Sequence, residues 1–160
     1  MAKNNIIPDE ADRIRANTSE EYNARIDRFT ENNIRFYATQ NKEMITERID
    51  ELEEEWDVDR LVQLCISGVG VSSILLGVIG SKKWWLLTIA AVGFLGNHAV
   101  SGWCPSSALF RRLGFRTRQE IDSEKYALKA LRGDFDELSN FENGTIDEKI
   151  QSIIGAVKTL

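Results

Sequence analysis

The chain has 160 residues, enough for one ordinary domain, and a formal net charge of −5. The negative charge argues against a nucleic-acid-binding protein, because basic patches are needed to contact phosphates. Two cysteines, Cys65 and Cys104, are too few for a disulfide framework and match no zinc-binding spacing. Charged side chains are unevenly distributed, since residues 61–104 contain only Lys82 and Lys83.

Residues 1–60 are polar and predict a short N-terminal tail followed by helices. Residues 1–18 are expected to be flexible, and no apolar core of a cleavable signal peptide is present. The pattern Thr18-x-x-Glu21 is a capping box and predicts the start of a helix. Residues 19–60 then carry two apolar stripes at helical spacing, which are Tyr22, Ile26, Phe29 and Phe36, then Ile45, Ile49, Leu52 and Trp56. Because no Gly or Pro lies between Tyr22 and Ser67, the second helix is expected to continue into the apolar segment.

Two apolar segments, residues 61–80 and 84–103, form the centre of the chain. Each is about 20 residues long, which is enough to cross a hydrocarbon core of about 30 Å as a helix. The short connection between them predicts antiparallel neighbours, so residues 61–104 are interpreted as a transmembrane helical hairpin. Tryptophans lie at both ends of this hairpin, Trp56 and Trp103 at one end and Trp84 and Trp85 at the other. Such placement is typical of interfacial anchors, whereas the alternative is a buried hairpin in a soluble protein.

The Lys and Arg residues near the hairpin predict its orientation. Two lysines lie in the connection, whereas six arginines flank the other end, namely Arg48, Arg60, Arg111, Arg112, Arg116 and Arg118. By the positive-inside rule both termini are therefore expected in the cytoplasm. The chain is interpreted as a multi-pass protein of the bacterial cytoplasmic (inner) membrane.

Small and polar residues at heptad-like spacing predict how the two spans pack, because close helix contact in lipid needs small side chains. The first span has Gln63, Gly70, Ser73, Gly77 and Gly80, and the second has Ala90, Gly93, Asn97, Ser101 and Cys104. Folding about the connection is expected to place Ser73 opposite Gly93 or Phe94, Gly70 opposite Asn97, and Gln63 opposite Cys104. Gly68 and Ser72 form a second small-residue pair on another face. We therefore expect a homo-oligomer in the lipid bilayer, with a further membrane or cytoplasmic protein as a possible partner.

Residues 105–160 are interpreted as cytoplasmic helices. Ser106 or Ser107 is expected to cap a short helix that ends at Gly114, and the capping box Thr117-x-x-Glu120 begins a helix that stops near Gly133. A third box, Thr145-x-x-Glu148, opens a terminal amphipathic helix. The acidic residues 50–59 and the basic residues 111–118 return to the same side of the hairpin. They are expected to face each other, the alternative being two separately solvated surfaces.

The motif Gly102-Trp103-Cys104-Pro105, within the run from Ala91 to about Ile121, resembles the YgaP-like two-helix transmembrane domain family. Two further blocks, residues 54–60 and 127–135, are similar to those of a subgroup of longer bacterial membrane proteins. The resemblance covers roughly residues 20–136. It implies a two-helix bacterial membrane module that occurs alone or behind rhodanese domains. The chain has no rhodanese active-site loop, so the resemblance does not imply sulfur transfer.

Cys104 and His98 are the candidates for chemistry. Cys104 is interpreted either as a redox or persulfide-carrying thiol or, as we favour, as a small packing residue in the exit turn. A thiolate there would be stabilised by the nearby arginines and opposed by the dipole of the helix that ends before it. His98 is expected to be neutral and hydrogen-bonded to the neighbouring helix at the level of Cys65, because no carboxylate lies in the spans to form a proton relay.

The sequence thus predicts an all-α protein, a transmembrane helical hairpin with amphipathic cytoplasmic helices before and after it. No catalytic triad, metal cluster or cofactor motif is apparent, so a structural or protein-interaction role is preferred to an enzyme. The alternative function is a membrane thiol protein that uses Cys104 in sulfur-transfer or redox chemistry. A third function, a small transporter or channel subunit, would need an oligomer with a polar path through His98, Asn97 and Gln63.

Overall fold

A computed structural model describes residues 12–135, and within this range the secondary structure is entirely helical. The helices are α1 (Arg13–Ala16), α2 (Glu20–Tyr37), α3 (Lys42–Glu54), α4 (Val58–Ile79), α5 (Trp84–Ser101), α6 (Pro105–Leu113) and α7 (Arg118–Arg132). The prediction of an all-α chain with a helical hairpin is confirmed. The helix predicted from Thr145 and the greater part of the predicted flexible N-terminus lie outside the described residues.

The chain divides into two compact units. Among the described residues, the first contains 12–30 and 55–121, and so holds α1, α4, α5, α6, the N-terminal part of α2 and the first turn of α7. The second contains residues 31–54 and 122–135, and so holds α3 with the remaining parts of α2 and α7. The hairpin and the candidate site both belong to the first unit.

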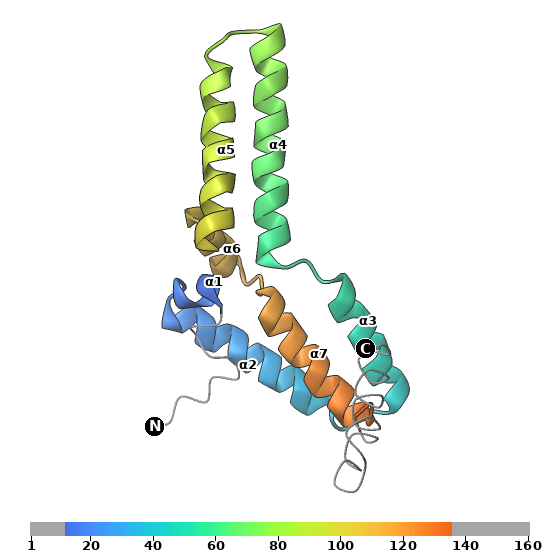
Figure 1. Ribbon diagram of the computed structural model, residues 1–160. Helices are drawn as coiled ribbons and strands as arrows, with labels where there is room; N and C mark the ends of the chain where they lie inside the picture. Colours follow the sequence, from blue (N-terminus) through green and yellow to red (C-terminus); the bar gives the residue numbers. More distant parts are fainter. Residues whose placement is uncertain (1–11, 136–160) are drawn as a thin grey trace, which may run out of the picture. The chain divides into compact units, whose positions relative to one another are not determined.

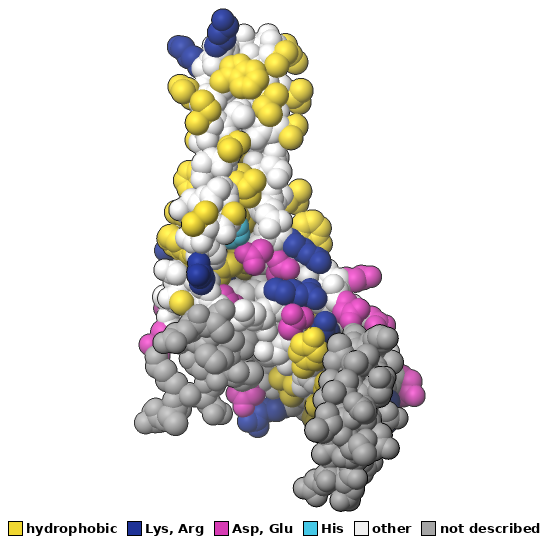
Figure 2. Space-filling view, viewed as in Figure 1, with side chains coloured by type: hydrophobic (Ala, Val, Ile, Leu, Met, Phe, Trp, Pro, Cys, Tyr) yellow, Lys and Arg dark blue, Asp and Glu magenta, His cyan; other side chains and the backbone are white. Residues whose placement is uncertain are grey.

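Helices α4 and α5 run antiparallel, side by side, and are joined by residues 80–83 (Figure 1). Both are long and apolar enough to cross a membrane. The outward side chains of the hairpin are apolar and uncovered, as for Val78 (71% exposed), Ile79 (83%), Leu86 (70%) and Val100 (83%). Figure 2 shows hydrophobic side chains over the visible face of the hairpin with few charged ones among them. So much exposed apolar surface favours association with a membrane.

The contact between α4 and α5 is made by residues repeating every three or four positions. On α4 these are Val62, Ile66, Gly70, Ser73 and Gly77, and on α5 they include Thr88, Ala91 and His98. Ser73 is fully buried, and its hydroxyl donates to Gly70 O (2.8 Å) and lies 2.7 Å from Thr88 Oγ1. Gly77 lets the Trp85 indole approach, since a Cβ at Gly77 would lie only 3.0 Å from Trp85 Nε1.

The predicted register of the hairpin is wrong. Ser73 faces Thr88, which precedes Gly93 on α5 by more than one helical turn. A Cβ at Gly93 would meet open space, and Gln63 is exposed rather than placed against the buried Cys104. The apex of the hairpin lies closer to Gly80 than expected, because the backbone N–H groups of residues 84–86 already bond to the carbonyls of residues 81–83. The Ser73 and Thr88 hydroxyls, which need a partner when buried, meet in this register.

The second helix does not continue into the first span as expected, because α3 ends at Glu54 and α4 begins at Val58. Asp57 has an extended backbone conformation and caps α4, its Oδ1 accepting a hydrogen bond of 2.8 Å from Arg60 N. An Asp side chain at this position satisfies a free N–H group of the first turn, so a new helix start competes with continuation.

In the second unit the apolar stripe of α3 is buried as predicted, at Ile45, Ile49 and Leu52. The buried Glu124 of α7 accepts hydrogen bonds from Arg48 Nε (3.1 Å) and Asn33 Nδ2 (3.3 Å). Helix α7 ends at Arg132, followed by Gly133 with φ of 97°. The predicted stop near Gly133 is confirmed, and its left-handed backbone explains the glycine.

Substitution of Gly77 is expected to destabilise the hairpin, because Gly77→Leu places a large side chain against Trp85. Overpacking of this kind costs about 1–3 kcal/mol. Gly93→Leu, which adds the same side chain in open space, is the matched control and should leave the stability of the monomer nearly unchanged. Thermal unfolding of the two variants in detergent measures the difference. Equal losses for both would contradict the observed register.

Candidate functional site at the exit of the second span

Helix α5 ends at Gly102, and two features of the local structure require a glycine at this position. Gly102 has φ of 65°, a left-handed conformation that closes the helix, and its N–H donates to His98 O at 2.8 Å. The side chain of Arg13 passes directly over it, so that a Cβ at this position would lie 2.9 Å from Arg13 Cδ. Any other residue would therefore meet both backbone strain and a steric clash.

Arg13 caps the end of α5 from outside the hairpin. Its Nη1 donates to Val100 O at 3.2 Å and to Ser101 O at 3.0 Å, two carbonyls of the last turn. A cation is favourable there because the C-terminal carbonyls of a helix carry partial negative charge. The contact ties the short helix α1 to the exit of the second span.

Asn97 and Ser101 act in the exit turn. The Ser101 hydroxyl lies 2.7 Å from Asn97 O and 2.8 Å from Trp103 O, and Asn97 Nδ2 donates to Trp103 O at 3.4 Å. Asn97 is exposed along α5. The expectation that Asn97 packs against the first span is therefore wrong, whereas the same expectation for the half-buried Ser101 stays a prediction.

Cys104 is fully buried in an apolar cluster with Ile14, Val58 and Val62. It occupies the N-cap position of α6, followed by Pro105 in the first turn, where proline is well tolerated. Its Sγ lies 2.9 Å from Ser106 Oγ and 3.3 Å from Ser107 Oγ. The Gly-Trp-Cys-Pro motif is thus the end of one helix and the start of the next.

Burial and hydrogen bonding act on the Cys104 thiol in opposite directions. Burial by itself would raise the pKa of the Cys104 thiol, but hydrogen bonds from Ser106 and Ser107, through both hydroxyl and backbone groups, lower the pKa below its ordinary value. The dipole of α6 acts in the same direction, because Cys104 lies at the N-terminus of that helix. The opposition expected from the dipole of the preceding helix α5 stays a prediction.

His98 is paired with a carboxylate that the sequence placed outside the span. His98 is buried, and its Nε2 lies 3.1 Å from Asp59 Oδ1 in the first turn of α4. The expected hydrogen bond to the neighbouring helix is present. The expected level at Cys65 is wrong, however, because the shifted register brings His98 to the N-terminal end of α4.

Glu120 joins three segments of the first unit, namely α1, α6 and the start of its own helix α7. It is buried and accepts hydrogen bonds from Arg15 Nη1 (2.7 Å), Arg111 Nη2 (2.8 Å) and Thr117 N (2.9 Å). The Thr117-x-x-Glu120 capping box is therefore confirmed. Burial would raise the pKa of Glu120, but Arg111, Thr117 and Arg15 hold the pKa below its ordinary value.

The two arginines extend this network to α2. Arg15 also binds Asp27 through a hydrogen bond of 2.8 Å, and Arg111 Nη2 donates to Asn23 Oδ1 at 2.8 Å. A separate ion pair joins Arg116 and Glu55, in which Arg116 Nε donates to Glu55 Oε1 at 2.8 Å. For this pair, the predicted contact between the acidic residues 50–59 and the basic residues 111–118 is confirmed.

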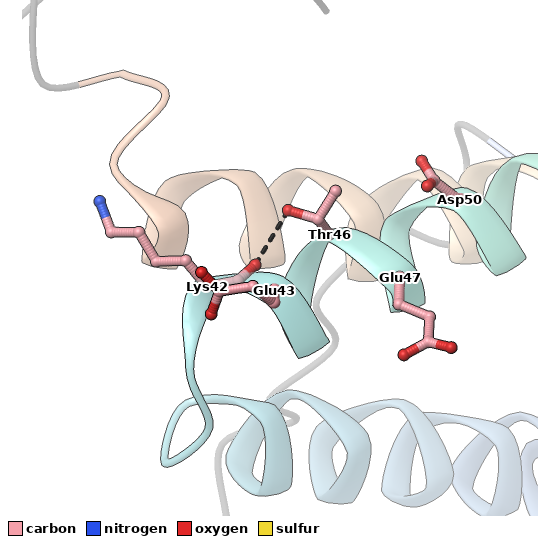
Figure 3. A pocket seen from close by; sticks show the side chains of 5 residues that line it. All are labelled: Lys42, Glu43, Thr46, Glu47 and Asp50. Atoms are coloured by element: carbon pink, nitrogen blue, oxygen red, sulfur yellow. Dashed lines mark hydrogen bonds between the residues drawn. The ribbon is translucent and has the colours of Figure 1, made fainter.

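The remaining predicted residues lie apart from this site. Gln63 and Cys65 are exposed along α4, and Trp56, Trp84 and Trp85 are exposed near the ends of the hairpin, whereas Trp103 is half-buried in the exit turn. In the second unit, a depression of about 420 Å³ lies along α3 and is lined by Lys42, Glu43, Thr46, Glu47 and Asp50 (Figure 3). Between residues 12 and 135 no cluster of three His, Cys, Asp or Glu side chains could hold a metal ion.

Comparisons with protein-family models, with curated proteins and with solved structures found no match. The arrangement at the exit turn is therefore interpreted from its own geometry. Sequence reasoning missed Arg13, Asp59 and the Arg15–Glu120–Arg111 network. Glu120 was detectable as part of a capping box, whereas nothing in the sequence pairs it with two arginines from distant segments.

Glu120→Gln is expected to destabilise the first unit by about 3–5 kcal/mol, because it removes the charge partner of the buried Arg111 and leaves the buried Arg15 with Asp27 alone of its two carboxylates. In the wild-type protein, the contribution of ionised Glu120 to the free energy of unfolding is complete at neutral pH. This contribution is lost as the pH falls from about 4.3, the ordinary pKa of a free glutamate, through the lower pKa of Glu120 in the folded protein. Unfolding in detergent as a function of pH measures both effects.

Glu31→Gln is the control for this experiment, since Glu31 forms an exposed i,i+4 pair with Arg35. Its loss should cost about 0.5 kcal/mol or less. An equal effect of the two substitutions, or no loss of wild-type stability in acid, would contradict the proposed importance of Glu120.

Proposed function

We propose that α4 and α5 cross a lipid bilayer and that the protein is a membrane-anchored helical module with a structural or protein-interaction role. One observation carries this proposal, namely the inverted burial of the hairpin. Polar Ser73 and His98 are buried in the hairpin, whereas many large apolar side chains of both helices, such as Ile79, Leu86 and Val100, face outward. A helix pair in water would place these groups the other way round, whereas in lipid the polar groups must be satisfied internally.

The proposed location is the bacterial cytoplasmic membrane, with both termini in the cytoplasm. Lys82 and Lys83 are the charged residues of the connection, whereas arginines gather where the spans leave the apolar region, including Arg13, Arg60, Arg111, Arg112 and Arg116. This asymmetry favours the arginine-rich end as the cytoplasmic one.

We further propose membership of the YgaP-like transmembrane family, on the basis of the Gly102-Trp103-Cys104-Pro105 motif. The geometry gives a physical reason for this motif. Gly102 permits the left-handed turn under Arg13, Cys104 fills an apolar space, and Pro105 begins α6. These roles are structural and require no reaction.

Self-association is proposed through the small residues that the hairpin leaves uncovered. Gly68 and Ser72 are exposed one turn apart on α4, and a Cβ at Gly68 would meet nothing within 4 Å. A second copy could bring its backbone close at such a surface, and close approach is what drives helix association in lipid.

A thiol function of Cys104 is the second candidate, and the lowered pKa of its thiol favours it. The complete burial of Cys104 favours packing, because a reacting thiolate must be reached by its substrate. We prefer the packing role, so that Cys104 stabilises the junction of α1, α4 and α6.

The membrane proposal predicts that the protein remains in the membrane fraction through carbonate and high-salt washes, because the apolar faces of two spans contact lipid. Reporter fusions at both termini should report the cytoplasm, and a cysteine at Ser81 should label from outside intact cells. Immunoblots of washed membranes and maleimide labelling measure these outcomes.

Release by carbonate would overturn the transmembrane hairpin. Labelling of the Ser81 cysteine only after permeabilisation would reverse the orientation.

In the same membranes, crosslinking should capture a dimer that Gly68→Leu weakens while Gly93→Leu serves as the comparison. Loss of the dimer in both variants, or in neither, would contradict the proposed face.

The packing role of Cys104 predicts that the thiol stays free and reacts slowly. Cys104→Ser should leave insertion intact and lower stability by about 1 kcal/mol, the scale of one lost small contact. Thiol trapping in intact cells followed by mass spectrometry of the Cys104 peptide checks this. A persulfide or mixed disulfide in a large fraction of molecules would instead establish the thiol function.

A further inference from the structure

A cavity of about 460 Å³ lies where the two spans end, within the first unit. Its walls include Asp12, Arg13, Asp59, Gly102, Thr117 and Arg118. Asp59 lies in the first turn of α4 and Gly102 closes α5, so the cavity lies at the level where the chain leaves the spans. Its volume falls in the range of about 300–1,000 Å³ that is typical of small-molecule sites.

One carboxylate oxygen of Asp12, in the wall of the cavity, receives no hydrogen bond in the described part of the chain. Asp12 is only 6% exposed, and its Oδ1 accepts from Arg15 N at 2.9 Å. Its Oδ2 is buried and has no hydrogen-bond partner in the described part of the chain. A buried carboxylate oxygen without a donor is costly, so this wall favours a ligand that brings an N–H group.

The cavity also combines both signs of charge. Asp59 pairs with His98 and lies close enough to Asp12 and Asp57 for their negative charges to repel each other, which favours an incoming cation. Arg13 and Arg118 line the same cavity. Arg13 uses Nη1 for the carbonyls of α5, and a guanidinium carries further N–H groups suited to a phosphate.

We propose that this cavity binds the headgroup of a phospholipid of the ethanolamine type. The primary ammonium group is held by Asp12 and Asp59, and the phosphate by Arg13 and Arg118. This inference rests on the proposed membrane function, which places the cavity at the depth of the lipid headgroups. A choline headgroup has no N–H donor for Asp12, and a glycerol headgroup brings no cation to offset the carboxylates.

Native mass spectrometry of the purified full chain in detergent, with dihexanoyl phosphatidylethanolamine, phosphatidylcholine or phosphatidylglycerol, tests the proposal. Ethanolamine lipid should bind at least about tenfold more tightly than either of the others, as one lost charge-assisted hydrogen bond implies. N-methylated ethanolamine lipids should bind progressively less well. Equal affinity for the ethanolamine and choline lipids would overturn the proposal even though the protein remains inserted through a carbonate wash.

Asp12→Asn should lower the affinity for the ethanolamine lipid about tenfold while the affinity for the choline lipid changes little. Glu43→Gln, an equivalent substitution in the depression along α3 (Figure 3), is the matched control and should change neither. Unchanged selectivity in Asp12→Asn would overturn the role of Asp12. If water-soluble glycerophosphoethanolamine binds as tightly as the ethanolamine lipid, the cavity recognises an ammonium–phosphate compound, and the proposal that the ligand is a lipid is overturned.

Discussion

The base of the hairpin depends on one buried carboxylate. Glu120 receives Arg15 from α1 and Arg111 from α6 while its own helix begins at the Thr117 amide. Through the same arginines, Asp27 and Asn23 bring in α2. None of these charges is tolerable in a buried place by itself, so each fixes the position of the others. The network therefore joins α1, α2, α6 and the start of α7.

Within the hairpin, pairs of polar side chains determine how α4 is aligned against α5, because apolar contacts alone do not select one alignment. Apolar side chains face outward around both helices, so burial of apolar surface does not select one alignment in lipid. The Ser73–Thr88 and His98–Asp59 pairs both form in the observed register. A slip by one turn would leave all four groups without these partners.

The exit turn connects these two parts and gives the molecule its candidate chemistry. Arg13 caps α5 over Gly102, and Cys104 begins α6 inside an apolar cluster. The same crossing leaves the mixed-charge cavity beside Asp12. If this cavity selects one lipid headgroup, the position of the helices next to the spans would depend on the lipid composition of the bilayer.

The sequence by itself determined the all-α class and the hairpin but not the break between α3 and α4, because span length, helical periodicity and capping patterns are local properties. Ile49, Gly133 and the Thr117-x-x-Glu120 box were therefore placed correctly. Only the tertiary structure decided which residues meet. Ser73 could be assigned to a packed face but not to Thr88, since several alignments bury small residues equally well. The partners of Glu120 depend on where distant segments cross, and that crossing is a property of the whole fold.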